Sequence, residues 1–270
     1  MTDPLLLQPI LQRRLTHAPW VDPRFRRLPG IQPLRPGTWL EVDDAYAAQM
    51  ALRDWLLDHR RDAVVADLPG AEPATQELLK HVLDGVSALP GFDVRPYRVR
   101  RPDGVEIAPD EADPLGTLGR LVQEDFCVIE RRQGAHVLTA AVLCFPASWT
   151  LAEKMGRPLD AIHAPVPAYD AGLARRVNRL FDAIRVGQGL WRVNVLGYDD
   201  PALFQPRPEG APRPAPCGTP AFVRSERQCL VRLPDTQAVV FSIHTTVVAR
   251  TALAAAEAAA LAEMEGAEGA

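Results

Sequence analysis

Features that mark metal clusters, membrane spans and nucleotide sites are missing from this 270-residue chain. Its four cysteines include no C-x-x-C pair, so their spacing favours neither a zinc site nor an iron–sulfur cluster. No apolar run approaches the roughly 18–20 residues that a membrane span needs. Phosphate loops, H-E-x-x-H, nucleophile elbows and G-x-G-x-x-G are also absent. We therefore expect a cytoplasmic protein with buried, reduced thiols.

Neither sign of charge dominates the composition. The formal net charge is -4 and the sequence pI is about 5.9. The chain therefore lacks the strongly basic composition that is typical of nucleic-acid-binding domains. The N-terminal stretch MTDPLLLQPILQRRL lacks the basic region and cleavage site of a signal peptide. Hydrophobic residues make up 47% of the chain, enough for a sizeable core. These numbers predict no nucleic-acid partner and no membrane partner.

The first part of the chain, residues 1–119, combines an irregular arm with short regular elements. Residues 1–40 are rich in proline and arginine and show no clean period. Apolar spacing predicts helices over residues 44–60 and 74–88 and a shorter one over 113–123. Between the last two, FDVRPYRVRRPDGVEIA alternates and turns at Asp103-Gly104, which predicts a hairpin. We expect this part to pack on the domain that follows it.

Residues 120–250 carry a different pattern. Two strands, two short helices and a long amphipathic helix, YDAGLARRVNRLFDAI, precede three further strands. The predicted strands are DFCVIERR, HVLTAAVLCF, GLWRVNVLGY, RSERQCLVRLP and QAVVFSIHTTVVA. This order is that of the PAS fold, an α+β arrangement with a five-stranded antiparallel sheet and helices on one face. Residues 251–270 predict an alanine-rich helix and a tail.

Two histidines are candidates for chemistry in such a fold. His163 ends the short helix PLDAIH at the rim of the expected cavity, where a neutral imidazole could ligate haem iron or simply bond a backbone carbonyl. His244 lies on the last strand, and alternation leaves open whether it faces the cavity, where it could be a ligand or an acid/base. We predict that His163 is the ligand and that His244 is catalytic.

Other candidates would line the cavity. Arg227 shares a face with apolar residues, so it needs a fixed anion such as a haem propionate, or an internal acid such as Glu226. Arg224 is on the opposite face and is expected in solvent unless the strand bends. Trp149 and Tyr169 could contact a bound group, or could be core or rim residues. We name Arg227, Arg224 and Trp149 as cofactor-binding candidates and Tyr169 as a catalytic one.

Several motifs resemble one known family. E-K-M-G-R-P-L, I-H-x-P-V-P, S-E-R-Q and F-S-I-H-T, within residues 40–250, are similar to the haem-dependent oxidative N-demethylase α-subunit family. The resemblance implies a haem b in the PAS cavity and partner subunits that carry flavin and an iron–sulfur centre. It also implies oxygen-dependent N-demethylation of a small amine such as dimethylamine, releasing formaldehyde.

Two alternatives stay open. A haem- or ligand-binding PAS sensor would share the fold, but such a sensor normally adjoins a kinase, cyclase or DNA-binding module, and the flanking segments fit none of these. A family member that has lost haem would share the motifs. For the enzyme, electrons must come from a partner reductase, because the chain has no cysteine set for a cluster and no nucleotide loop.

Overall fold

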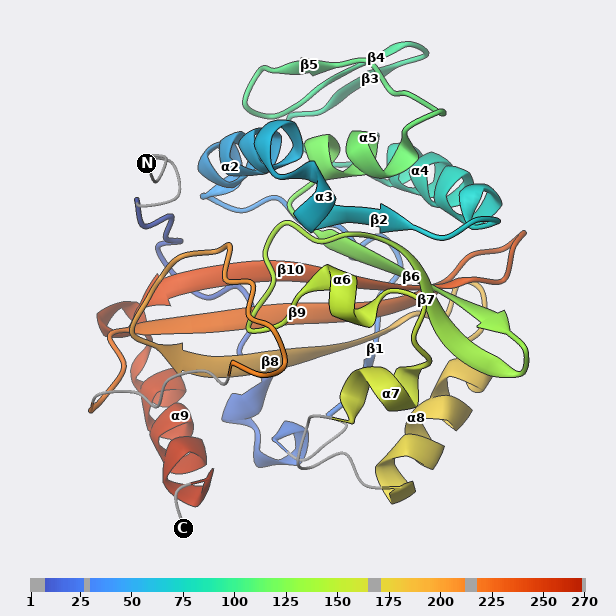
Figure 1. Ribbon diagram of the computed structural model, residues 1–270. Helices are drawn as coiled ribbons and strands as arrows, with labels where there is room; N and C mark the ends of the chain where they lie inside the picture. Colours follow the sequence, from blue (N-terminus) through green and yellow to red (C-terminus); the bar gives the residue numbers. More distant parts are fainter. Residues whose placement is uncertain (1–7, 27–29, 165–170, 212–217, 269–270) are drawn as a thin grey trace.

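A long antiparallel sheet organises the molecule (Figure 1). A computed structural model describes residues 8–26, 30–164, 171–211 and 218–268. Within them, seven strands follow the order β1-β8-β9-β10-β6-β7-β2, and each pairing is antiparallel. The strands are β1 (Gln32–Pro33), β2 (Val65–Asp67), β6 (Asp125–Arg132), β7 (Ala135–Val142), β8 (Leu190–Tyr198), β9 (Phe222–Arg232) and β10 (Val239–Ala249).

The sheet contains the five predicted strands, β6 to β10, but it is wider than predicted. Strand β1 of the arm pairs with β8, and β2 pairs with β7, so each extends one edge. The expectation of a five-stranded sheet is therefore wrong in its count. With two and three residues, β1 and β2 are too short to show an alternating pattern in the sequence.

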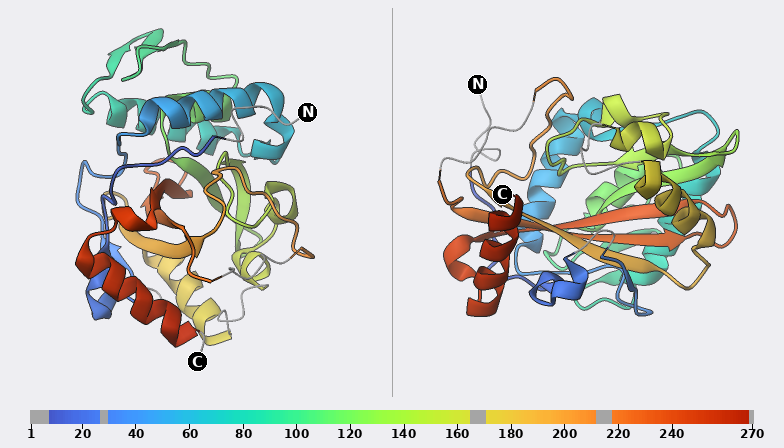
Figure 2. Two further views of the ribbon diagram at one scale, coloured as in Figure 1. Left: turned by 90° about the vertical axis from the view of Figure 1, so that its left-hand side faces the viewer. Right: turned by 90° about the horizontal axis from the view of Figure 1, so that it is seen from below.

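Helices cover both faces of the sheet, whereas the sequence predicted one. We call the face that carries Phe126 and Val240 the outer face, and the face that carries Cys127 and Ile243 the inner face. In the left-hand view of Figure 2 the sheet lies between the two groups of helices. The outer helices are α2 (Tyr46–His59), α3 (Arg61–Val64), α4 (Glu72–Val86) and α5 (Pro114–Leu121). The inner helices are α6 (Leu151–Lys154), α7 (Leu159–His163) and α8 (Ala171–Ala183).

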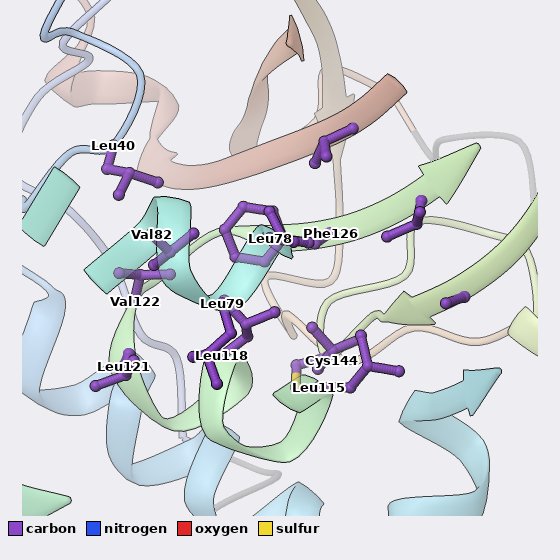
Figure 3. Close-up of a cluster of buried hydrophobic side chains, with 14 of the residues drawn as sticks. Leu40, Leu78, Leu79, Val82, Leu115, Leu118, Leu121, Val122, Phe126 and Cys144 are labelled. Carbon is purple, nitrogen blue, oxygen red and sulfur yellow. The ribbon is translucent and has the colours of Figure 1, made fainter. Parts of the chain in front are cut away.

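The main core lies between the outer helices and the sheet (Figure 3). Leu78 and Val82 of α4 and Leu118 of α5 are fully buried and pack towards Phe126 of β6. A Cβ at Gly119 would lie 2.9 Å from both Leu57 of α2 and Val142 of β7. Glycine at this position thus lets α5 approach its neighbours closely. The predicted helices over 44–60, 74–88 and 113–123 are confirmed.

A small second sheet lies beyond the outer helices (Figures 1 and 2). Its strands are β3 (Asp93–Arg95), β4 (Arg98–Arg100) and β5 (Glu106–Ile107). The predicted turn at Asp103-Gly104 joins β4 to β5, and Gly104 has a φ of 86°. Arg101 fastens this sheet to α2, because its buried guanidinium contacts Asp54 at 3.0 Å as well as Asp103.

The N-terminal arm and the last helix pack against each other and against the sheet. Two short 3-10 helices, Pro19–Val21 and Pro23–Phe25, bring Trp20 against Leu261 of α9 (Ala255–Glu268), which the 3-10 helix Arg250–Ala252 connects to β10. Cys127, Cys144 and Cys229 are buried and unbridged as predicted, and Cys217 lies outside the described residues. No helix among the described residues is long and apolar enough to cross a membrane.

Candidate functional site

The inner face of β8, β9 and β10 carries a patch of polar side chains. Alternation puts Arg192 and Asn194 of β8 and Glu226 and Gln228 of β9 on this face, and the register pairs Arg192 with Gln228 and Asn194 with Glu226. On the neighbouring strand β10, Thr245 is the register partner of Glu226. Arg192, Asn194 and Gln228 are only half-buried, although α7 and α8 cover this face. The helices therefore leave accessible surface over the middle of these strands.

Arg192 is the least compensated charge of this patch. Its Nε is shut off from solvent and has no hydrogen-bond partner among the described residues. Burial lowers the pKa of Arg192, and the nearby Glu226 carboxylate only partly opposes that effect. Glu226 itself accepts hydrogen bonds from Arg224 Nε at 3.1 Å and from Gln228 Nε2 at 3.3 Å. A guanidinium in this setting can bind an anion, because a buried charge is costly unless it is paired.

His163 lies against the same patch. It ends α7, and its Nδ1 is 2.8 Å from the Leu159 carbonyl oxygen, so Nδ1 carries the proton of the neutral ring. Burial lowers the pKa of His163, and the charges of Lys154 and Arg192 lower it further, although the Leu159 hydrogen bond opposes them. The imidazole is thus held neutral, and a neutral imidazole is the form that ligates metals.

Apolar side chains complete the surroundings of the patch. Trp149, Ile162, Leu230 and Phe241 are half-buried and pack against the inner core. Thr245 Oγ1 and Ser148 Oγ, next to Trp149, are buried without a hydrogen-bond partner among the described residues. The inner face therefore combines an apolar wall with unsatisfied polar atoms. Tyr169, the other predicted aromatic candidate, lies outside the described residues.

His244 faces the opposite way from His163. It is buried on the outer side, with Nδ1 3.1 Å from Glu124 and Nε2 3.1 Å from Asp43. Burial alone would lower the pKa of His244, but the two carboxylates outweigh it and raise that pKa to about 10. A fixed imidazolium between two carboxylates links the N-terminal region to β6 and β10. The structure thus separates the two predicted histidines by the thickness of the sheet.

The two predicted arginines also lie apart. Arg227 faces outward, where its NH1 and NH2 donate to the carbonyl oxygens of Trp39 and Thr38 and NH1 lies 3.4 Å from Glu41. Internal partners thus account for this arginine, which corrects the expectation of a haem propionate. Arg224 faces inward and is 2% exposed, so the expectation that it lies in solvent is wrong. Besides Glu226 it binds the carbonyl oxygens of Leu203 and Phe145.

Sequence reasoning did not name Arg192 and named Glu226 only as a possible partner of Arg227, because alternation left open which face of these strands lines the cavity. Here both faces are covered, and the apolar one packs on α2, α4 and α5. The alternation of side chains along each strand could have revealed the patch. Two polar residues lie two positions apart on each strand, Arg192 and Asn194 on one and Glu226 and Gln228 on the next.

One known protein family matches most of this chain. The family model described as haem-dependent oxidative N-demethylase, alpha subunit-like, matches residues 30–267. The chain belongs to this family. Its match covers β1, both groups of helices and almost all of α9, and it includes every residue of the inner polar patch. The family description indicates haem dependence and oxidative demethylation of nitrogen.

The inner face has the chemistry that haem requires. Haem combines an apolar ring with two carboxylates and an iron that takes an axial ligand such as histidine. The half-buried Trp149 and Phe241 provide apolar contacts, and the unpartnered guanidinium of Arg192 provides a cation for a propionate. Haem needs no multi-residue metal cage, and no group of three or more His, Cys, Asp or Glu residues in the described parts of the chain could hold an ion.

Proposed function

We propose that this chain is the haem b subunit of an enzyme that oxidatively demethylates a small methylated amine such as dimethylamine. The observation that supports it most is the neutral His163 within electrostatic reach of Arg192, whose Nε has no hydrogen-bond partner among the described residues, in the region that the family model matches. The inner face would then be a PAS-type cavity, with strand order β7-β6-β10-β9-β8 around it.

Each inner-face residue takes a role in this proposal. His163 would hold the haem iron, Arg192 would hold a propionate and Trp149 would contact the ring. Glu226, whose carboxylate is oriented by Arg224 and Gln228, binds the ammonium group of the substrate. His244 stabilises the packing of the arm on the opposite face and does not touch the substrate.

Bound haem would supply oxygen activation and oxidation of the N-methyl group, while the protein supplies orientation and electrostatics. Glu226 would hold the ammonium so that one methyl group points towards the cofactor, and the apolar wall of Trp149 and Phe241 would limit water. The products would be the shorter amine and formaldehyde. Because this oxidation consumes electrons, we include a reductase partner that carries flavin and an iron–sulfur centre.

A haem titration followed by a turnover assay tests the proposal. We expect one haem per chain with a Soret band, and formaldehyde release that depends on dimethylamine, oxygen and a supplied reductant. A chain that stays colourless in added haem would remove the cofactor and with it the enzyme. Haem binding without formaldehyde release from any small methylated amine would favour a haem-binding sensor instead. Glu226→Gln should raise KM for the amine and leave the Soret band unchanged.

A further inference from the structure

The exposed side of α8 is cationic. This helix packs one apolar stripe against the inner core, in which Phe181 is buried and Val177 is half-buried. Its fully exposed positions are Arg175, Arg176, Arg179, Asp182 and Ala183. Three of these five are arginine, in a chain whose formal net charge is -4. Positive charge is thus concentrated on one helix of an acidic protein.

Among the described residues, no carboxylate lies within ion-pair distance of these arginines, Arg175, Arg176 and Arg179. Two exposed arginines of the small sheet behave differently, because Arg95 pairs with Asp93 at 2.8 Å and Arg98 with Glu106 at 2.9 Å. Three unpaired guanidinium groups on neighbouring turns repel one another, which is unfavourable unless an anionic partner is bound.

The one acid among those exposed positions is already engaged. Asp182 Oδ1 lies 3.0 Å from both Arg131 NH1 and His136 Nε2. It therefore balances Arg131 and leaves the charge of the helix arginines unchanged.

The cationic region continues past the end of the helix. A recess of about 370 Å³ opens there, lined by Arg131, Asp182 and Arg185 over an apolar floor that includes Ile184 and Val186. Arg185 is exposed and has no ion pair within the described residues. We name the set Arg175, Arg176, Arg179 and Arg185 the α8 cationic surface. It offers both charge and a concave feature to a partner.

The chemistry of this surface selects one class of partner. A membrane-binding helix needs large apolar side chains beside its cations, and the exposed positions of α8 have none. Nucleic-acid binding usually involves a strongly basic domain, which an overall charge of -4 does not provide. A protein with an acidic patch needs only local complementarity, which steers association and fixes orientation.

The position of α8 relates this surface to the candidate site. Helix α8 lies beside α7, where Asn178 donates to Asp160 at 2.9 Å, and α7 carries His163. A protein bound to the exposed side of α8 would therefore dock on the helix that packs beside α7 and His163.

We propose that the α8 cationic surface is the docking site of an acidic electron-donor protein. The nature of the donor rests on the proposed function, because the demethylation draws electrons from outside the chain. Each transfer oxidises the donor by one electron and reduces ferric haem to ferrous haem, and no bond forms or breaks. The surface itself is defined by charge alone and can be tested without haem.

The first experiment measures how fast a protein donor reduces the haem-loaded chain. The variant combines Arg175→Glu, Arg176→Glu and Arg179→Glu, and reduced plant-type ferredoxin, an acidic carrier, is the probe in stopped-flow absorbance at low salt. We expect a reduction rate about 10-fold or more below wild type, because electrostatic steering changes association rates by roughly 10–1,000-fold. Reduction by dithionite, a small molecule, should be unchanged.

A matched variant controls for total charge. Arg13, Arg14 and Arg100 are exposed and lie outside α8, so replacing all three with glutamate gives the same change in net charge. We expect less than about a 2-fold change for this control. Equal losses in the two triple variants, or none in the α8 variant, would overturn the proposal.

The second experiment uses the haem-free chain and poly-L-glutamate as an acidic polypeptide, with binding followed by calorimetry at low and physiological salt. Binding to wild type and the control variant but not to the α8 variant supports the docking surface, even if haem never binds and the proposed function fails. Absence of binding in wild type overturns it. So does binding of duplex DNA or phosphatidylserine vesicles in place of the polypeptide when it depends on the same arginines.

Discussion

The two faces of strands β8 to β10 differ in how fully the chain compensates their charged residues. On the outer face, His244 and Arg227 meet Asp43, Glu124, Glu41 and backbone carbonyls supplied by the same chain. On the inner face, Arg192 has no ion-pair partner among the described residues. The Nε atoms of both Arg192 and Arg227 lack a hydrogen-bond partner there, and Arg192 is half-buried whereas Arg227 and His244 are buried. What differs is whether the protein itself supplies the counter-charge.

The contrast shows where an external ligand is needed. A buried charge that the fold compensates stabilises the packing and gains nothing from a ligand, whereas an uncompensated one can be balanced by a bound anion. Arg227 and Arg192 occupy neighbouring strands and differ only in the face to which they point. The role of an arginine on these strands therefore cannot be assigned until the face to which its side chain points is known.

The largest expected effect follows from removing the proposed ligand on the inner face. His163→Ala should abolish the native Soret spectrum or weaken haem binding by at least about 100-fold, because loss of mere supporting residues around a metal already costs roughly 10–100-fold. Haem titration measures it, and His59→Ala, at an exposed histidine of α2, is the control. An unchanged spectrum in His163→Ala would place the ligand elsewhere.

On the outer face, His244→Ala should act on stability instead. It leaves two buried carboxylates, Asp43 and Glu124, without their cation, and breaking a buried pair in this way costs about 3–5 kcal/mol. Urea unfolding measures the change, and haem affinity of the folded fraction should match wild type. Loss of haem without loss of stability would reverse the roles of the two faces.

The two arginines sharpen the comparison further. Arg192→Gln should speed haem transfer to apomyoglobin by about 10-fold, since a charge-assisted bond contributes roughly 1.5–3 kcal/mol. Arg227→Gln keeps the haem rate near wild type and lowers the unfolding free energy, because its partners are the carbonyls of Trp39 and Thr38. Equal haem loss from both variants would contradict the assignment of faces.

A smaller effect should appear in the pH dependence of stability. The folded pKa of His244, about 10, lies above the ordinary histidine value near 6.5. Its stabilisation is therefore complete below about pH 6.5 and is lost as pH rises towards 10, at up to roughly 1.4 kcal/mol per pH unit. The unfolding free energy of wild type should fall between pH 7 and 9 more steeply than that of His244→Gln. Parallel curves would show that His244 is not charged in the folded state.

The sequence predicted long elements and their order well. The helices, the hairpin at Asp103-Gly104 and the five long strands have periods or turn residues that local patterns reveal. It could not predict β1 and β2, because their pairing depends on strand edges that exist only in the folded sheet. Only part of the candidate site could be predicted from the sequence, for the same reason. His163 stood out by its place at the end of a short helix, whereas Arg192 and Arg224 depended on knowing which face the outer helices cover.

The free edge of β10 has a consequence for how the chain is made. Beyond Ile243 this strand has no β6 partner, and Gln12 takes that place. Its backbone N–H donates to the Val247 carbonyl, its side-chain oxygen accepts from Val247 N, and its amide reaches the Thr245 carbonyl. During synthesis Gln12 is made well before its binding edge, which follows 235 residues later in sequence. The arm can therefore dock only after β10 has been made, and until then β10 presents an unpaired edge to other chains.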